Sequence, residues 1–169
     1  MEPLTVKTPR LTIRTNDLDG MQALLDGCTD PEMQDAYRDM MEVMRRCPGR
    51  QEWGCEWNII LTQTSAVIGG ICFKGTADTQ GRVELGYGIE EPYRCRGYAA
   101  EAVRAMAAWA LSQPEVQCVL AQTEPHNAIS QRVLAKCGFV RCGNGEEGPL
   151  FSLTQTPVLH GQQQPACSR

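Results

Sequence analysis

Residues 83–109 read VELGYGIEEPYRCRGYAAEAVRAMAAW, and this stretch decides the fold. Its first seven residues alternate between the two sides of an extended chain, which is the period-two pattern of a β-strand. A charged turn follows. From about residue 97 to residue 112 the chain is rich in alanine, with Val103, Met106 and Ala110 on one stripe of a helix. A strand that leads into a helix indicates a sheet with helices packed against it.

Working outward from this stretch, alternation and turn residues predict the remaining elements. Further strands are expected at residues 11–14, 56–62, 66–75, 116–123, 139–142 and 149–156. Further helices are expected at residues 17–27, capped by Thr15 or Asn16, at residues 31–46, where Thr29-Asp30-Pro31-Glu32 is a capping sequence, and at residues 128–137. The strands begin as antiparallel hairpins and later alternate with helices. This order predicts an α/β fold of the α+β type, with a mixed, twisted sheet of about six or seven strands and about four helices.

Length and charge limit the classes of function. The 169 residues suit one domain, expected over residues 1–156, followed by a polar and flexible tail at residues 157–169. The net charge of −4 argues against a nucleic-acid partner and suits a cationic partner such as an amine. No apolar run approaches the ~20 residues that span a bilayer, and no signal peptide is visible, so we expect no membrane partner and a cytoplasmic location.

Nine cysteines are present, at positions 28, 47, 55, 72, 95, 118, 137, 142 and 167. Their number is odd, their spacing is irregular, and none forms a C-x-x-C pair, so zinc-ribbon and thioredoxin-type sites are excluded. Several lie within apolar runs, where a thiol behaves as a small hydrophobic group. Reduced thiols in a cytosolic protein, and no metal site, are therefore expected.

The loop before the long helix has the properties of an anion site. A helix start presents unpaired N–H groups and the positive end of the helix dipole. Arg94 and Arg96 add charge, Gly97 allows close approach of the backbone, and Ala99 keeps the first turn small, so a pyrophosphate would fit. An ordinary helix start with two solvated arginines is the alternative. No Walker sequence occurs, and the glycine pair at residues 86–88 lacks the third glycine of a dinucleotide fingerprint.

Two further features lie on either side of this loop. Alternation in the preceding strand places Glu84 on the same face as Gly86 and Gly88, which carry no side chains. A general base beside an open ligand site would be placed in this way. The alternative is a bulge or crowded sheet packing, with Glu84 in solvent. Farther along the chain, Asn127 and Ser130 open a helix. On spacing alone they are a capping residue and an inert first-turn serine.

Together these stretches resemble the GNAT superfamily of acyl-CoA-dependent N-acyltransferases, most closely the branch that acetylates the N-termini of ribosomal proteins. The resemblance spans roughly residues 8–153. It rests on PRLTIR at residues 9–14, VIGG at 67–70, ELGYGI at 84–89, RCRGYA at 94–99, which fits [RQ]-x-x-G-x-[GA], Glu101-Ala102, Asn127-x-x-Ser130 and Lys136-x-Gly138-Phe139. It implies a GNAT fold and acetyl-CoA as cosubstrate, with no metal.

The resemblance also implies residue roles on the cofactor side. Backbone groups of Arg94, Cys95, Arg96, Gly97, Tyr98 and Ala99 would hold the pyrophosphate of coenzyme A. Tyr87, Gly88 and Ile89 would pair with the pantetheine arm, and Asn127 would contact the cofactor.

On the catalytic side, the resemblance makes Glu84 the general base. Many members of the family use a tyrosine acid where this chain has Leu134, so Ser130 is the implied acid. Covalent catalysis by a cysteine such as Cys95 is disfavoured, because the two histidines, His126 and His160, are not evident partners.

The predicted reaction is direct transfer of an acetyl group from acetyl-CoA to a primary amine, either a protein N-terminus or a small amine. Two features leave the identity of the acceptor undetermined. Position 88 is a glycine where related sequences often carry an aromatic residue, and the segment at residues 142–149 is short. One rival hypothesis is an acyl-CoA sensor or scaffold of the same fold without activity. Another is a nucleotide-binding regulatory module. A monomer or a homodimer fits the sequence equally well.

Overall fold

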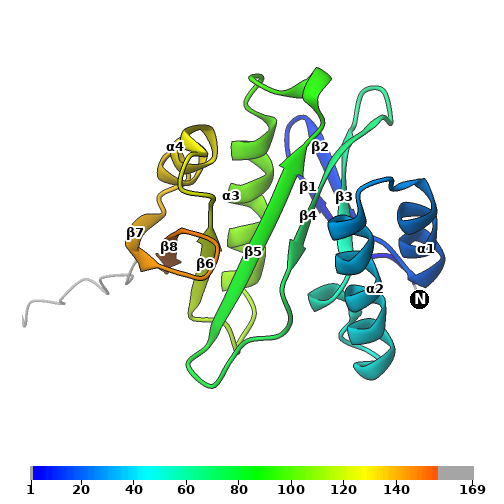
Figure 1. Ribbon diagram of the computed structural model, residues 1–169, viewed down its shortest axis with the longest axis horizontal. Helices are drawn as coiled ribbons and strands as arrows, with labels where there is room; N and C mark the ends of the chain where they lie inside the picture. Colours follow the sequence, from blue (N-terminus) through cyan, green and yellow to red (C-terminus); the bar gives the residue numbers. More distant parts are fainter. Residues whose placement is uncertain (1, 156–169) are drawn as a thin grey trace, which may run out of the picture.

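A computed structural model describes residues 2–155, which build an eight-stranded sheet and four α-helices (Figure 1). The strands are β1 (Thr5–Lys7), β2 (Leu11–Thr15), β3 (Glu56–Leu61), β4 (Val67–Phe73), β5 (Arg82–Ile89), β6 (Cys118–Gln122), β7 (Val140–Asn144) and β8 (Pro149–Thr154). The helices are α1 (Leu18–Gly27), α2 (Pro31–Arg46), α3 (Tyr98–Leu111) and α4 (Ala128–Lys136), with 3-10 turns η1 (Gln51–Trp53) and η2 (Glu91–Tyr93). The predicted tail at residues 157–169 lies outside the described residues.

The strands lie in the order β1-β2-β3-β4-β5-β6-β8-β7, and only β5 and β6 run parallel. The expected mixed sheet with an antiparallel N-terminal part is therefore confirmed. Its eight strands exceed the six or seven predicted, because β1 was missed. This strand has only three residues, too few to show alternation, and it pairs with β2 through Val6 opposite Ile13.

The helix starts follow side-chain capping. Helix α2 begins and ends as predicted, with Asp30 accepting the Glu32 N–H at 3.0 Å. The prediction that Thr15 or Asn16 caps α1 is wrong. Asp17 is the cap and accepts the Gly20 N–H at 2.8 Å. The Asn16 side chain instead exchanges hydrogen bonds with Asn58 between β2 and β3, so it is not available to the helix.

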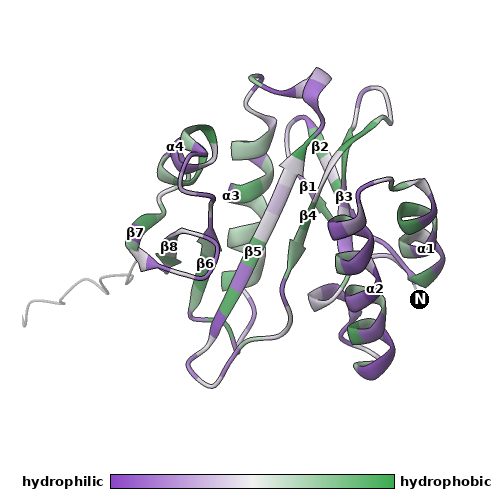
Figure 2. Cartoon of the chain, viewed as in Figure 1, coloured by the Kyte–Doolittle hydropathy of each residue, from purple (hydrophilic) through white to green (hydrophobic). Residues whose placement is uncertain are grey.

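The two faces of the sheet have different coverings. On the α3 face, Trp57 of β3 is in register with Ile71 of β4, and Leu85 of β5 is in register with another apolar residue of β4. All three side chains are buried. The predicted stripe of Val103, Met106 and Ala110 on α3 is confirmed, since all three are fully buried. The opposite face, which we call the α2 face, carries Glu56, Cys72 and Gly86 in register, with Tyr37 of α2 beside Glu56. Figure 2 shows β5 passing from alternating polar and apolar residues to a nearly neutral stretch.

An aromatic cluster locks α3 onto its face of the sheet. The Trp109 ring lies 5.0 Å from the rings of Trp53 and Trp57 and 5.7 Å from that of Phe73, measured between centroids. Such contacts add ~0.5–1.5 kcal/mol each beyond area burial. Helix α3, which follows the loop with the predicted anion site, is thus fixed against the sheet.

The eight cysteines within residues 2–155 are free thiols. In that same part of the chain, no helix has the length and apolar character needed to cross a membrane. No group of three or more His, Cys, Asp or Glu side chains among these residues is arranged to hold a metal ion.

Candidate functional site

The two parallel strands separate shortly after they begin. Strand β5 pairs with β6 only over residues 82–84, whereas its other edge stays paired with β4 as far as Ile89. Residues 85–89 therefore turn an unpaired edge toward a gap beside β6. Such an edge binds an extended ligand through main-chain hydrogen bonds. Tyr87, Gly88 and Ile89, for which contacts with the pantetheine arm were predicted, lie on it.

At the end of β5, the predicted pyrophosphate loop turns into α3 through left-handed backbone at Cys95 (φ 60°) and Gly97 (φ 81°). No side chain caps this helix start. The backbone N–H groups of residues 95–100 have no acceptor among the residues described. These groups point to an anion that the chain itself does not supply. Arg94 donates to the carbonyl of Ile89 at 2.9 Å, which ties the loop to the strand end.

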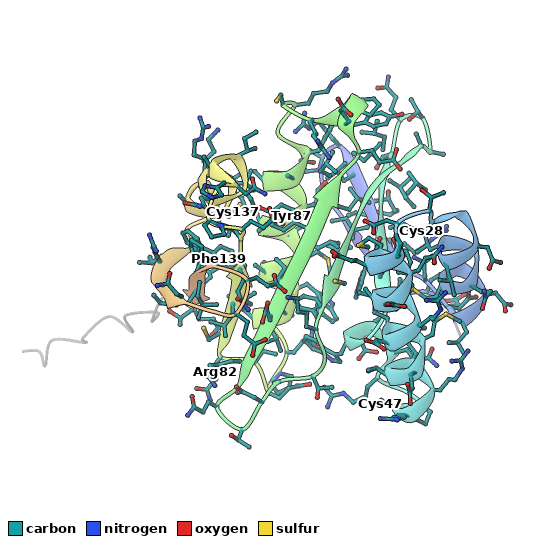
Figure 3. All side chains as sticks on the ribbon, in the orientation of Figure 1. Cys28, Cys47, Arg82, Tyr87, Cys137 and Phe139 are labelled. Atoms are coloured by element: carbon teal, nitrogen blue, oxygen red, sulfur yellow. The ribbon has the colours of Figure 1, made fainter. Side chains whose placement is uncertain are left out.

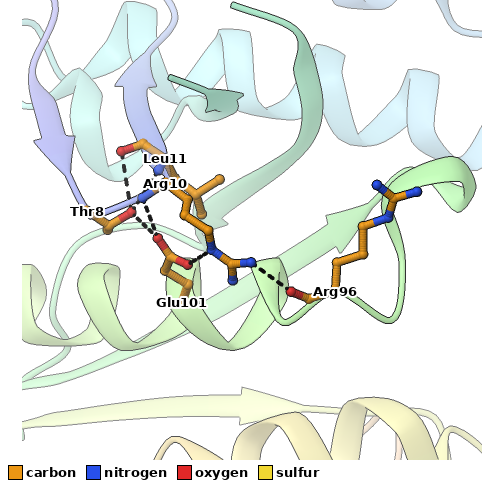
Figure 4. Close-up of polar contacts among 5 residues, drawn as sticks. All are labelled: Thr8, Arg10, Leu11, Arg96 and Glu101. Atoms are coloured by element: carbon orange, nitrogen blue, oxygen red, sulfur yellow. Dashed lines mark hydrogen bonds and ion pairs between the residues drawn. The ribbon is translucent and has the colours of Figure 1, made fainter. Parts of the chain in front are cut away.

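A network that the sequence did not reveal holds this loop from the turn between β1 and β2 (Figure 4). The Arg10 guanidinium donates to the Arg96 carbonyl at 3.0 Å and to the Glu101 carboxylate at 2.7 Å, and it lies 4.5 Å from the centre of the Tyr98 ring. Thr8 donates to the same carboxylate at 2.6 Å. Partial burial pushes the pKa of Glu101 up, but the hydrogen bonds from Thr8 and Arg10 outweigh burial and hold the pKa below its usual value. Arg10 therefore fixes one carbonyl of the loop, while the loop N–H groups keep no partner among the described residues.

Ser130, the predicted acid, lies in the first turn of α4 and is hydrogen-bonded to a tyrosine. The Tyr87 hydroxyl is 2.7 Å from the Ser130 hydroxyl, and Asn127 accepts the Ser130 N–H at 3.0 Å as the helix cap. Burial raises the pKa of Tyr87, while the hydrogen bond with Ser130 lowers it. Figure 3 shows Tyr87 on the side of β5 toward Cys137, at the end of α4. The structure thus brings Tyr87, Asn127 and Ser130 together, and it places the Tyr87 phenol in a hydrogen bond with the predicted acid, Ser130.

Glu84, the predicted base, lies on the α2 face at the closed end of the gap. Its Oε1 is 2.7 Å from the Lys74 ammonium and accepts a hydrogen bond from Gln122 at 3.1 Å. Lys74 also pairs with Glu147 at 2.8 Å. The sequence alternative of a solvated Glu84 is thus replaced by an ion-paired one, and the structure does not bring Glu84 to Ser130, which adjoins the other face of β5.

The bare strand face extends over β4 and β5. A Cβ atom placed at Gly88 would meet no atom within 4 Å, and one at Gly86 would meet only the Cys72 sulfur, at 3.5 Å. The α2 face of β5 therefore opens on empty space beside the gap. Two hollows of the surface lie elsewhere, one that includes Leu4 and Asp17 and one that includes Gln80 and Pro114.

Residues 9–140 match the family model described as "Acetyltransferase (GNAT) domain". The chain is 34% identical over 84 residues to the uncharacterized N-acetyltransferase YjdG of Bacillus subtilis, in a match that spans only half of each chain. It is 26% identical over 150 residues to the uncharacterized N-acetyltransferase p20 of Bacillus licheniformis, which covers 82% of this chain and 84% of p20.

The fold is that of solved acetyltransferases. The ribosomal-protein acetyltransferase RimL in complex with coenzyme A superposes with a TM-score of 0.70, covering 89% of this chain and 98% of RimL, at 12% identity. Identity this low supports likeness of fold alone. The family model, which spans most of the described residues, carries the assignment: the chain belongs to the GNAT family of acetyltransferases.

Proposed function

We propose that this chain transfers the acetyl group of acetyl-CoA directly to a primary amine. One observation carries the proposal: the unpaired edge of β5 joins two binding features in a line. At one end are the N–H groups of residues 95–100, which have no described acceptor, and along the strand are the bare positions Gly86 and Gly88. A pyrophosphate at the helix start and a pantetheine arm along the edge would bring a thioester beside the open α2 face.

The acceptor class follows from the same face. A glycine at position 88 leaves space where a side chain would narrow the approach. The chain is acidic, with a net charge of −4, and attracts cationic acceptors. A protein N-terminus or a small amine is therefore the proposed acceptor, and the ribosomal-protein enzymes among the structural neighbours favour testing N-terminal peptides first.

Proton donation to the leaving thiolate is assigned to Ser130 together with Tyr87. A serine hydroxyl alone is a weak acid. Its hydrogen bond to the Tyr87 phenol gives the pair a more acidic group than an aliphatic hydroxyl, although burial raises the pKa of this phenol above its usual value. Glu84 is the base that the family resemblance implies, and its ion pair with Lys74 is the feature that an experiment has to address.

The test measures the release of free coenzyme A from acetyl-CoA against a panel that includes an N-terminal peptide, a polyamine and an amino sugar. Turnover with at least one amine, with binding of acetyl-CoA that ATP does not compete away, is the expected result. Displacement by ATP would instead support the nucleotide-binding module.

A second candidate is an acyl-CoA sensor of the same fold. It is favoured by Leu134, which is fully buried where many members of the family carry a tyrosine acid. Tight binding of acetyl-CoA without turnover of any amine in the panel would decide for the sensor.

A further inference from the structure

A second carboxylate on the α2 face, that of Glu56, lies near the open part of β5. Glu56 begins β3 and is in register with Cys72 of β4, which in turn is in register with Gly86 of β5. Paired residues of neighbouring antiparallel strands point to the same face. Glu56 therefore shares the bare face of β5 and is separated from it by one strand.

The side chain of Glu56 leans over that intervening strand. A Cβ atom at Gly70 would lie 2.0 Å from Glu56 Oε1, so only glycine accommodates the carboxylate there. Gly70 is in register with Gly88, and neighbouring strands lie ~4.8 Å apart. The carboxylate thus reaches to about one strand spacing from the open position at Gly88.

Glu56 also differs from Glu84 in its electrostatic surroundings. None of the ion pairs between residues 2 and 155 includes Glu56. The titratable groups around it are Tyr37 of α2, with which it shares a hydrogen bond, Cys72 of β4 and Cys55 next to it in the chain. Burial raises the pKa of Glu56 to about 7, although the hydrogen bond with Tyr37 lowers it. A general base works best when its pKa is near the operating pH.

We propose that Glu56 is the general base that takes the proton of the acceptor ammonium, with Tyr37 as its positioning residue, an inference that rests on the proposed acetyl transfer. The geometry behind it is the carboxylate lying over Gly70 beside the open positions of β5. The cationic acceptor would be attracted to the same carboxylate that deprotonates it.

The proton and electron movements balance as follows. One proton passes from the ammonium to a carboxylate oxygen of Glu56. The freed nitrogen lone pair then forms a bond to the acetyl carbonyl carbon, and the carbon–sulfur bond breaks with its electron pair on sulfur. A second N–H proton reaches the thiolate by way of the Ser130 and Tyr87 hydroxyls, which leaves an amide and free coenzyme A. Glu56 returns its proton to solvent.

The test compares Glu56→Gln, Glu84→Gln and the control Glu52→Gln, which lies outside the proposed site, for kcat/KM as a function of pH and for acetyl-CoA affinity. Glu56→Gln is expected to lose ~10²–10⁴-fold in kcat/KM near neutral pH. The loss should shrink at high pH, where the amine is already neutral, and acetyl-CoA affinity should be unchanged. Wild-type activity in Glu56→Gln, or the same pH pattern of loss in Glu84→Gln alone, overturns the proposal.

Gly70→Ala provides an independent test that keeps the carboxylate. The new Cβ displaces Glu56 Oε1 from its position over β4, so activity near neutral pH should fall while acetyl-CoA binding persists. In a Glu56→Gln background, Gly70→Ala should cost little more, because coupled residues are not additive. Full additivity would contradict the geometry. A wild-type chain that binds no acetyl-CoA and turns over no amine would instead overturn the proposed function itself.

Discussion

The proposed cofactor side and the proposed acceptor side of β5 are built in opposite ways. On the cofactor side, side chains from distant elements fix the backbone: Arg10 binds the Arg96 carbonyl, and Glu101 holds Arg10. On the acceptor side the face is formed by missing side chains, at Gly70, Gly86 and Gly88. Acetyl-CoA is the same ligand in every turnover, so a rigid backbone can bind it. An open face instead selects its acceptor through one or two charged side chains.

The largest effect should come from breaking the cofactor side at Gly97. Gly97→Glu places a carboxylate against the unpaired N–H groups and forces a left-handed backbone (φ 81°) on a non-glycine residue. Acetyl-CoA affinity should fall by more than ~100-fold, measured by calorimetry, because the carboxylate competes with the pyrophosphate for the N–H groups.

Gly97→Ala is the matched control for Gly97→Glu, because it keeps the backbone strain of ~1–2 kcal/mol without the charge. Its loss of affinity should be clearly smaller. Equal losses in the two variants would mean that strain, and not the anion, decides.

The next effect concerns the link between the two sides, the hydroxyl pair of Tyr87 and Ser130. Tyr87→Phe and Ser130→Ala should each lower kcat by roughly 10-fold, at the low end for general acid catalysis because one hydroxyl remains. The double variant should lose little more than the worse single one, since the pair acts as a unit. KM for acetyl-CoA should stay constant.

Steady-state kinetics with varied acetyl-CoA checks the hydroxyl pair, and Ser112→Ala, at the far end of α3, serves as the control. Independent, multiplicative losses in the double variant would exclude a shared proton path.

Local patterns predicted the helices well. The capping sequence at Asp30 and the stripe on α3 depend on residues within a few positions of one another, and both are found as predicted. The glycine-rich face of β5 was also visible in its alternation. These features need no knowledge of which strands are neighbours.

Long-range pairing hid the rest of the site. Arg10 meets a carbonyl 86 residues away, and Tyr87 meets Ser130 across 43 residues. Glu56 lies over Gly70 only because of the register of the β3–β4 hairpin, which shifts between Ile59 and Ile60. A one-residue slip would send the carboxylate to the opposite face. No motif carries that information, and so the sequence offered no reason to consider Glu56.

A further variant loosens the loop at residues 94–99 but leaves in place the N–H groups that are proposed to bind the pyrophosphate. Arg10→Ala removes the hydrogen bond to the Arg96 carbonyl and leaves Glu101 without its cation. The loop amides lose their fixed direction, so KM for acetyl-CoA should rise roughly 10-fold, about the value of one hydrogen bond to a charged group, while kcat changes little. Arg14→Ala, at an exposed position on the neighbouring strand β2, should leave both constants unchanged. A fall in kcat with constant KM would contradict a positioning role.

The smallest effect tests the acceptor side through stability alone and needs no substrate. The pKa of Glu56 is raised from 4.5 to about 7 in the folded chain, so the folded state binds the proton more tightly than the unfolded state does. The stability that protonated Glu56 supplies is complete below the unfolded pKa and is lost as the pH rises through about 7. Glu56→Gln does not titrate.

The melting temperature of Glu56→Gln relative to wild type should therefore increase between pH 5 and pH 8. The gain is ~1–2 kcal/mol after allowing for residual solvent contact, or roughly 2–8 °C by scanning calorimetry. Glu52→Gln should show no such trend. A difference in melting temperature that does not change with pH would mean that Glu56 is ionised at little cost. The contrast between the cofactor side and the acceptor side would then rest only on the glycines of the acceptor side.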